Sequence, residues 1–476
     1  MSSTLIQGTF VCTPTIGSLQ ILSDHLIAVS STTGLITHFA PITSSSSIEL
    51  LQSSPSPPIV LPPGTFLLPN FCDLHIHAPQ FLYQGTGLHL PLMQWLDEYA
   101  YKAEERLDAD AGLARRVYTR LATRLVEKGT GTVLLFGTIK EETNLILAEI
   151  MQKAGLRAFV GKLSMDISSR PTYTEPSAAA SLYSASSFIT QCQHLTSSLP
   201  LHRRLVAPVL TPRFVPTCSD ELLSGLAALS VSQSLVIQSH MSESRDEVTW
   251  VRDLRGAEDI EVFEKHGLLT PRTIQAHCTF LSIPNLTHLS TLGTAVAHCP
   301  LSNAYFSDKP FPLREALIQG VKVGLGTDVA GGYDLDIMSS MRYAVAVSRM
   351  REGTRALTVH ADGPRVPAVG ASAENLSINW QEALYLATQG GAHALGLPPG
   401  SGNFEIGTPF DAQQIQLLDP ETRQGIGALD FFDLETGAEG NILLTLEMVE
   451  KWWCVGDDRN RVGMWVQGNN LFEKAR

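Results

Sequence analysis

Two histidines one residue apart, His75 and His77, are the first residues whose types and spacing could do chemistry. They end an apolar run that reads as a β-strand, and on a strand residues i and i+2 point to the same face. Both imidazoles can therefore reach one metal ion. An isolated pair can also be two surface histidines or two hydrogen-bonded core histidines, so further ligands are needed to decide.

Polar residues end three later apolar runs in the same way, namely His240, His277 and Asp328. In a barrel of parallel strands, functional groups gather at the carboxyl ends of the strands. Imidazole and carboxylate ligands without thiolates suit a catalytic zinc ion or a similar divalent metal. The repeated placement of such residues predicts a divalent-metal centre.

Glu243 follows His240 by three residues. A carboxylate in this position can lie beside a metal without binding it and can carry protons, which metal-assisted hydrolysis requires. The alternative is an acidic residue at the start of a helix that pairs with Arg245.

The elements that must position these residues form a repeating pattern from residue 66 onward. Short β-rich runs recur, and most are separated by helical patterns such as 111–128 and 141–154. The β-rich runs are Phe66–His77, Thr130–Ile139, Arg157–Asp166, Leu205–Phe214, Leu235–Glu243, Thr273–Phe280, Thr294–Asn303 and Val321–Val329. Eight units over about 260 residues match a closed (β/α)8 barrel. An open doubly wound sheet gives the same local pattern, but the number of units favours the barrel.

Both ends of the chain differ from this pattern. Short strand-like runs occupy the first 65 or so residues and return near Ile442–Leu446, and a Ser/Pro-rich segment at 44–58 is expected to be a loop. We expect one small β-sandwich domain, built from residues 1–67 and 401–476, beside a barrel domain at 68–400.

Composition narrows the class of protein. Over 476 residues, 34 Lys+Arg and 47 Asp+Glu give a net charge of −13, which disfavours binding to nucleic-acid phosphates or to an anionic membrane surface. No uninterrupted apolar window is long enough for a transmembrane helix, and the first residues lack a signal-peptide pattern. The seven cysteines form no CxxC pair, which is typical of reduced thiols. We therefore expect a cytoplasmic enzyme.

Five segments carry a resemblance to a known family. They are PNFCDLHIHAPQ at 69–80, TPRF at 211–214, QSHMSE at 238–243, HCPLSN at 298–303 and GTDVAGG at 326–332. With them the chain resembles the amidohydrolase superfamily and, within it, the branch that deaminates guanine. The resemblance extends from about Phe66 to Ala412.

The resemblance implies one zinc ion per chain and a set of residues for it. The implied metal ligands are His75, His77, His240 and Asp328. The implied catalytic residues are Glu243 as proton shuttle, Asp328, and His277 beside the metal. Relatives with two metals carry a carboxylated Lys at the end of the fourth strand, where this chain has Arg213. An Arg cannot form that carbamate, so one metal is expected.

The resemblance also implies the contacts of the substrate. The implied substrate-binding residues are Gln80, Arg213, Phe214, His77 and His240. An Arg offers fixed donors to a carbonyl oxygen such as O6 of guanine, and a Gln amide offers both a donor and an acceptor. Without the motif, Arg213 would be interpreted as a surface salt-bridge partner, Gln80 as a solvated loop residue and Phe214 as a core aromatic residue.

The activity implied is hydrolysis of guanine to xanthine and ammonia, with guanine and water as the small-molecule partners and a homodimer as the assembly. One alternative is an amidohydrolase that acts on another aminopurine or a triazine. A second is a catalytically inactive barrel kept as a scaffold, which would not be expected to retain the ligand set. The segment Glu352–Ser377 is longer than in relatives.

Overall fold

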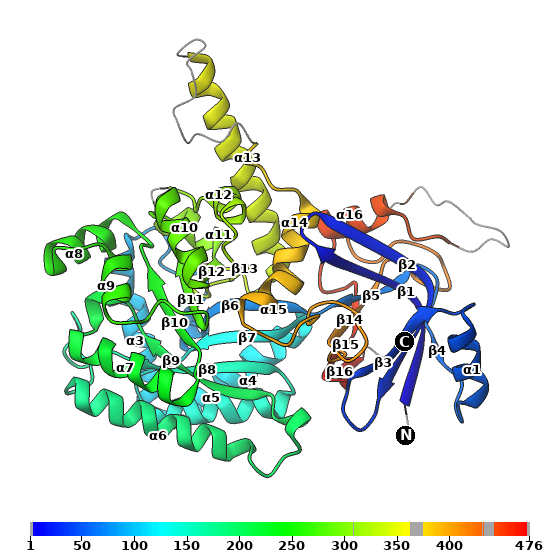
Figure 1. Ribbon diagram of the computed structural model, residues 1–476, viewed down its shortest axis with the longest axis horizontal. Helices are drawn as coiled ribbons and strands as arrows, with labels where there is room; N and C mark the ends of the chain where they lie inside the picture. The colour runs from blue at the N-terminus through cyan, green and yellow to red at the C-terminus, as the bar shows by residue number, and fades with distance from the viewer. Residues whose placement is uncertain (1–2, 308, 362–374, 431, 433–441, 474–476) are drawn as a thin grey trace.

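The computed structural model describes residues 3–307, 309–361, 375–430, 432 and 442–473, and Figure 1 shows their arrangement. It consists of a parallel barrel and a separate β-sheet formed by the two ends of the chain. Within the long segment Glu352–Ser377, residues 362–374 lie outside this description.

Eight parallel strands form the barrel in sequence order. They are β6 (Phe71–His77), β7 (Thr130–Phe136), β8 (Arg157–Ser164), β9 (Val206–Pro212), β10 (Ile237–Met241), β11 (Thr273–His277), β12 (Ala295–His298) and β13 (Val323–Leu325). The chain just after β13 returns to β6, because the backbone N–H of Asp328 donates to the carbonyl oxygen of His75 at 2.8 Å. The (β/α)8 architecture expected from the sequence is confirmed.

Helices connect these strands. The α-helices of the barrel region are α2 (Leu92–Trp95), α3 (Tyr101–Ala109), α4 (Ala111–Glu127), α5 (Glu141–Ala154), α6 (Ala178–Thr196), α7 (Asp220–Gln233), α8 (Arg245–Arg255), α9 (Asp259–Lys265), α10 (Ile283–Leu292), α11 (Pro300–Phe306), α12 (Leu313–Ile318), α13 (Ile337–Ala361), α14 (Trp380–Tyr385) and α15 (Gly391–Ala394). Three 3-10 helices are η1 (Ala78–Tyr83), η3 (Leu201–Arg203) and η4 (Val215–Thr217), and two π-helical segments are η2 (Leu96–Ala100) and η5 (Leu386–Gly390).

Local sequence explains where these helices begin. The hydroxyl of Ser219 accepts a hydrogen bond from the backbone N–H of Leu222 and caps α7, with two acidic residues in its first turn. The expected strand Thr294–Asn303 is shorter than predicted. It ends at His298 because Pro300 opens helix α11, where its fixed φ and missing N–H suit the first turn.

The second sheet joins strands from both chain ends in the order β16-β15-β14-β5-β1-β2-β3, with β4 paired to β1. The strands are β1 (Ser3–Thr15), β2 (Ser18–Ser30), β3 (Ile36–Pro41), β4 (Ile59–Val60), β5 (Thr65–Pro69), β14 (Ala412–Gln416), β15 (Arg461–Val466) and β16 (Asn469–Glu473). Strand β5 pairs with β14 in antiparallel register. The boundaries at 67/68 and 400/401 remain a prediction.

Two expectations for the chain ends are wrong. The Ser-rich part of segment 44–58 forms helix α1 (Ser45–Ser53), because the hydroxyl of Ser44 accepts from the backbone N–H of Ser47 and supplies the cap. Leu50 and Leu51 pack that helix on the sheet. The run Ile442–Leu446 leads into helix α16 (Leu446–Val455), which the hydroxyl of Thr445 caps.

Buried polar contacts join the sheet to the barrel. The guanidinium of Arg157 on β8 pairs with the carboxylate of Asp411, and both side chains are 12% exposed. From β15, Arg461 donates to the backbone carbonyl of Glu127 at the end of α4. None of the described helices is both long and apolar enough to cross a membrane.

Candidate active site

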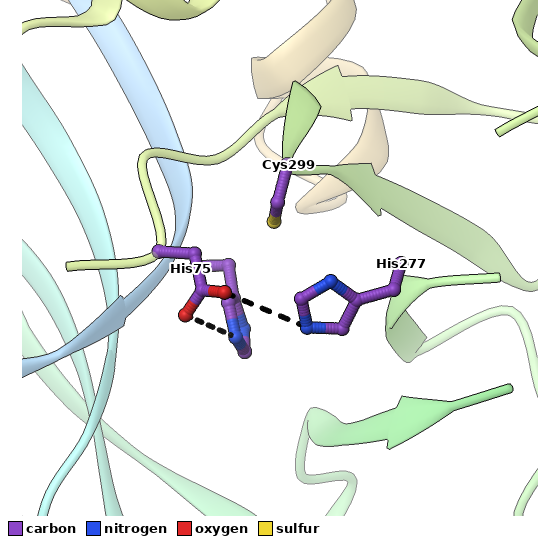
Figure 2. Close-up of side chains that lie close together, drawn as sticks. His75, His277 and Cys299 are labelled. Atoms are coloured by element: carbon purple, nitrogen blue, oxygen red, sulfur yellow. Dashed lines mark ion pairs between the residues drawn. The ribbon is translucent and has the colours of Figure 1, made fainter. Parts of the chain in front are cut away.

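Four strands place the four predicted metal ligands, and the predicted catalytic residue His277, at one end of the barrel. His75 and His77 lie in β6, His240 in β10 and His277 at the end of β11. Asp328 follows β13. All five side chains are buried. Figure 2 shows His75 and His277 turned toward a common space in which dashed lines mark ion pairs.

The distances between their polar atoms are those of a compact cluster. Nε2 of His75 lies 3.2 Å from Oδ1 of Asp328, and Nε2 of His77 lies 3.0 Å from Nε2 of His240. Nε2 of His277 lies 3.7 Å from Oδ2 of Asp328. The ligand atoms of His75, His77 and His240 all lie within 4.8 Å of one another. The structure therefore brings together all the ligands inferred from the sequence.

Hydrogen bonds on the far side of two rings fix which nitrogen faces the cluster. Nδ1 of His240 donates to the carbonyl oxygen of Arg213 at 2.6 Å, and Nδ1 of His277 donates to Oδ1 of Asn303 at 2.9 Å. Each Nε2 thus presents a lone pair. Burial also lowers the pKa of His75, His77 and His240 well below the usual range, and these imidazoles are neutral. Neutral imidazoles converging with a carboxylate fit a bound divalent cation.

Cys299 is a neighbour that the sequence interpretation did not place in the site. Its sulfur belongs to a second group of possible ligand atoms with His75, His277 and Asp328, also within 4.8 Å of one another (Figure 2). Burial raises the pKa of this thiol well above its usual range, and its S–H donates to the carbonyl oxygen of Ala297 at 3.6 Å. A metal-bound cysteine is a thiolate, whereas the contact of Cys299 with Ala297 is that of a protonated thiol.

Asp73 connects the first and last strands behind the cluster. Its carboxylate accepts hydrogen bonds from the backbone N–H of His75 at 3.2 Å and from both the N–H and the hydroxyl of Thr327. Burial raises its pKa to about 7 despite these bonds. Asp73 thereby fixes the backbones that carry His75 and Asp328.

Glu243 lies on the wall of the same cavity, just after β10. Its Oε2 is 3.5 Å from Nε2 of His277. Its backbone is held on both sides, because its N–H donates to Glu247 at 2.6 Å and its carbonyl oxygen accepts from the hydroxyl of Thr279 at 2.7 Å. Burial, and then the nearby charge of Asp328, raise the pKa of Glu243 well above the usual range. A buried carboxyl this close to the cluster is placed to give and take a proton.

A pocket opens over this cluster. It is lined by all five residues inferred as substrate contacts, of which His77 and His240 belong to the cluster itself. Gln80, Arg213 and Phe214 are each at most 4% exposed. The remaining lining residues are His77, Leu92, Trp95, Leu96, His240, Glu243, Phe306, Asp328 and Gly331. Apolar and aromatic walls with a few converging polar groups are typical of a site for a small flat ligand.

Glu104 is a second residue that sequence reasoning missed. Located on α3 and fully buried, it accepts two hydrogen bonds from the guanidinium of Arg213, at 2.6 and 3.1 Å. It also accepts one from the side-chain amide of Gln80 at 3.1 Å. No local signal in the sequence links it to Arg213, from which it is 109 residues away.

Comparison with known proteins agrees with this arrangement. The sequence model of the amidohydrolase family matches residues 66–470 of the chain. The chain is 34% identical to a guanine deaminase of Dictyostelium discoideum over 98% of each chain, and 35% identical to one of Mus musculus over 98% of this chain and 96% of that one. A crystal structure of guanine deaminase from C. acetobutylicum with bound guanine superimposes with a TM-score of 0.83 at 28% identity, covering 99% of this chain and 100% of that one.

Proposed function

The chain belongs to the amidohydrolase family and, within it, to the guanine deaminases; on that premise we propose that it hydrolyses guanine to xanthine and ammonia. One observation carries the proposal. The pocket places hydrogen-bonding groups of Arg213 and Gln80 beside a cluster of histidines and a carboxylate that fits a divalent cation. A purine amine can therefore be held next to a hydrolytic centre.

The metal in this proposal is one zinc ion per chain, held by the four residues inferred from the sequence. The set is His75, His77, His240 and Asp328. When bound, zinc would supply a Lewis acid that lowers the pKa of water toward about 7 and so makes a nucleophile available at neutral pH. Arg213 stands where relatives with two metals carry a carboxylated Lys, which supports a single ion.

Protons move through the residues that surround this centre. As water adds to C2 of guanine, Asp328 accepts one of its protons and Glu243 donates a proton to N3. The proton on Asp328 then passes to the C2 amine, which leaves as ammonia, and the remaining hydroxyl proton returns to Glu243. This leaves a carbonyl at C2 and restores both carboxyls. His277 lies within 3.7 Å of both carboxylates and orients the water between them.

The substrate is held by groups away from the scissile amine. Arg213 supplies N–H donors for O6 of guanine, and the Gln80 amide contacts the purine edge. Phe214 packs against the ring, with Trp95 and Phe306 completing the apolar walls of the pocket. Hydrogen bonds to O6 also favour 6-oxopurines over related rings, because an analogue without this oxygen leaves buried donors unpaired.

Ammonia release from guanine tests the proposal directly. The purified protein is assayed as isolated, after chelation and after zinc is added back, and xanthine is quantified alongside ammonia. We expect equal amounts of both products, loss of the activity on chelation and recovery with zinc. If the zinc-loaded protein released no ammonia from guanine, guanine would be excluded as the substrate. Assays with 2-aminopurine, 2,6-diaminopurine and an aminotriazine would then show which of these rings the enzyme accepts.

The sequence resemblance also supports a homodimer, and the scattered cysteines support a cytoplasmic location. Light scattering of the purified protein in solution measures the first, with twice the mass of the chain as the expected value. Fractionation of the source cells measures the second.

A further inference from the structure

We propose that Glu104 is a positioning residue that sets the substrate selectivity of this pocket, by holding the guanidinium of Arg213 and the amide of Gln80 in one orientation. The inference rests on the proposed deamination of guanine and adds to it a residue that does not line the pocket itself. Glu104 acts from behind, through the two side chains that face the substrate.

The first support is the number of bonds that converge on one buried carboxylate. Oε2 of Glu104 accepts from Nη1 of Arg213 at 2.6 Å, and Oε1 accepts from Nη2 of Arg213 and Nε2 of Gln80, each at 3.1 Å. The side chain of Glu104 is 0% exposed and that of Arg213 is 2% exposed. A bidentate pair fixes the plane of the guanidinium as well as its position.

The ring of Tyr101 gives the second support. The guanidinium carbon of Arg213 lies 4.8 Å from the centre of this ring. Tyr101 and Glu104 lie on the same helix, α3. One helix therefore contacts the guanidinium both on its face and along its edge, and the N–H groups that Glu104 leaves unused can point in only a few directions.

The amide of Gln80 is held in a single orientation. Its Nε2 donates to Glu104, while its Oε1 accepts from the backbone N–H of Ala330 at 3.3 Å. Rotating the amide by half a turn would place its oxygen against the carboxylate and its NH2 group against another N–H. Because both contacts would become repulsive, the donor and acceptor of Gln80 keep fixed places at the pocket.

Charge completes the argument. Glu104 neutralises the buried guanidinium, so the pocket presents hydrogen-bond donors without an excess positive charge. Such a surface favours a neutral carbonyl oxygen, as in a 6-oxopurine, over an anionic ligand. With the donors fixed in place, a purine without the 6-oxygen leaves them unpaired, which is a strong source of discrimination.

The test compares two probes that carry no amine to lose, one with the 6-oxo group and its N1 proton and one without either. Hypoxanthine has the 6-oxygen and purine lacks it, and calorimetry of the zinc-loaded protein measures the binding of each. In Glu104→Gln, we expect the preference for hypoxanthine over purine to fall at least tenfold. With guanine as the substrate, KM should rise by a larger factor than kcat falls, since the chemistry beside His277 is untouched.

Matched variants separate positioning from folding. Glu105→Gln changes the next residue of α3, whose carboxylate binds Arg170 at 2.6 Å and is 31% exposed, and it should leave the preference unchanged. Glu104→Asp keeps the charge but is one methylene too short to hold Arg213 and Gln80 together, so its preference should also fall. If Glu104→Gln does not fold, the binding preference of Glu104→Asp tests the positioning role instead.

The possible outcomes are distinct. A folded Glu104 variant whose preference stays within twofold of the parent overturns the inference. A parent protein that releases no ammonia from guanine overturns the proposed function instead, and the binding preference of the two probes still reports on Glu104.

Discussion

Glu243 combines burial with a position 3.5 Å from His277, and its role can be isolated by a change of one atom. Glu243→Gln keeps the shape of the side chain but cannot exchange a proton. We expect kcat for guanine to fall by about 10²- to 10⁴-fold, the usual contribution of a positioned acid–base group. Metal content, measured by elemental analysis, should stay at the parent value. Near-parent turnover in this variant would remove Glu243 from the proton path.

Cys299 allows a test of which atoms bind the metal. His75, His77, His240 and Asp328 already offer four nitrogen and oxygen ligands, and the S–H of Cys299 is engaged by the carbonyl oxygen of Ala297. Cys299→Ala should therefore retain zinc after dialysis, while His240→Ala should lose most of it. The measurement is zinc per chain after equal exposure to a chelator. Loss of zinc from the Cys299 variant would place the sulfur among the ligands.

Individual residues show which parts of the site could be predicted from the sequence and which could not. The histidines and Asp328 could be identified because each ends an apolar strand, which is a local signal that the barrel converts into proximity. Glu104 could not, because its partner Arg213 is distant in the chain and an acidic residue within a helix usually faces water. Cys299 lay in a segment that was recognised, but nothing local showed that its sulfur points toward His75.

At the scale of elements, strand positions were predicted more accurately than their ends. The run Thr294–Asn303 contains an apolar strand followed by Pro300, and only the strand part continues the sheet. Helix α1 was missed because serines favour loops on average, whereas Ser44 is placed to cap a helix. Composition describes a whole segment, but a cap depends on one hydroxyl.

The close packing of barrel strands makes a clear prediction at Gly161 on β8. A Cβ there would lie 2.0 Å from Oγ1 of Thr211 and 2.3 Å from Nε2 of Gln238. Gly161→Ala should lower the free energy of unfolding by about 1–3 kcal/mol, or more if the strands cannot move apart. Chemical denaturation measures the change.

Gly353 on α13 is the matched control. A Cβ there meets no described atom within 4 Å. Gly353→Ala should leave the free energy of unfolding unchanged or raise it by up to about 1 kcal/mol, because Ala is the better helix former. Equal effects of the two substitutions would contradict the packing argument.

At the scale of the whole molecule, stability depends on the junction between barrel and sheet. Asp411→Ala would leave the guanidinium of Arg157, which is 12% exposed, without its carboxylate. We expect a loss of about 2 kcal/mol in the free energy of unfolding, the usual size for a hydrogen bond to a charged group. Adding Arg157→Met should recover part of the loss. Asp253→Ala, on an exposed position of α8, should have little effect, and a similar loss there would point to a nonspecific cause.

The pairing of β5 with β14 has a consequence for how the protein is made. Strand β5 is synthesised before all the barrel strands, whereas β14, the partner that covers one of its edges, is synthesised after them. At about 5–20 residues per second, that edge waits for tens of seconds. During this interval the nascent chain displays unpaired backbone groups that can join another chain. A messenger cut short before β14 would thus encode every barrel strand, and its product would be prone to aggregate.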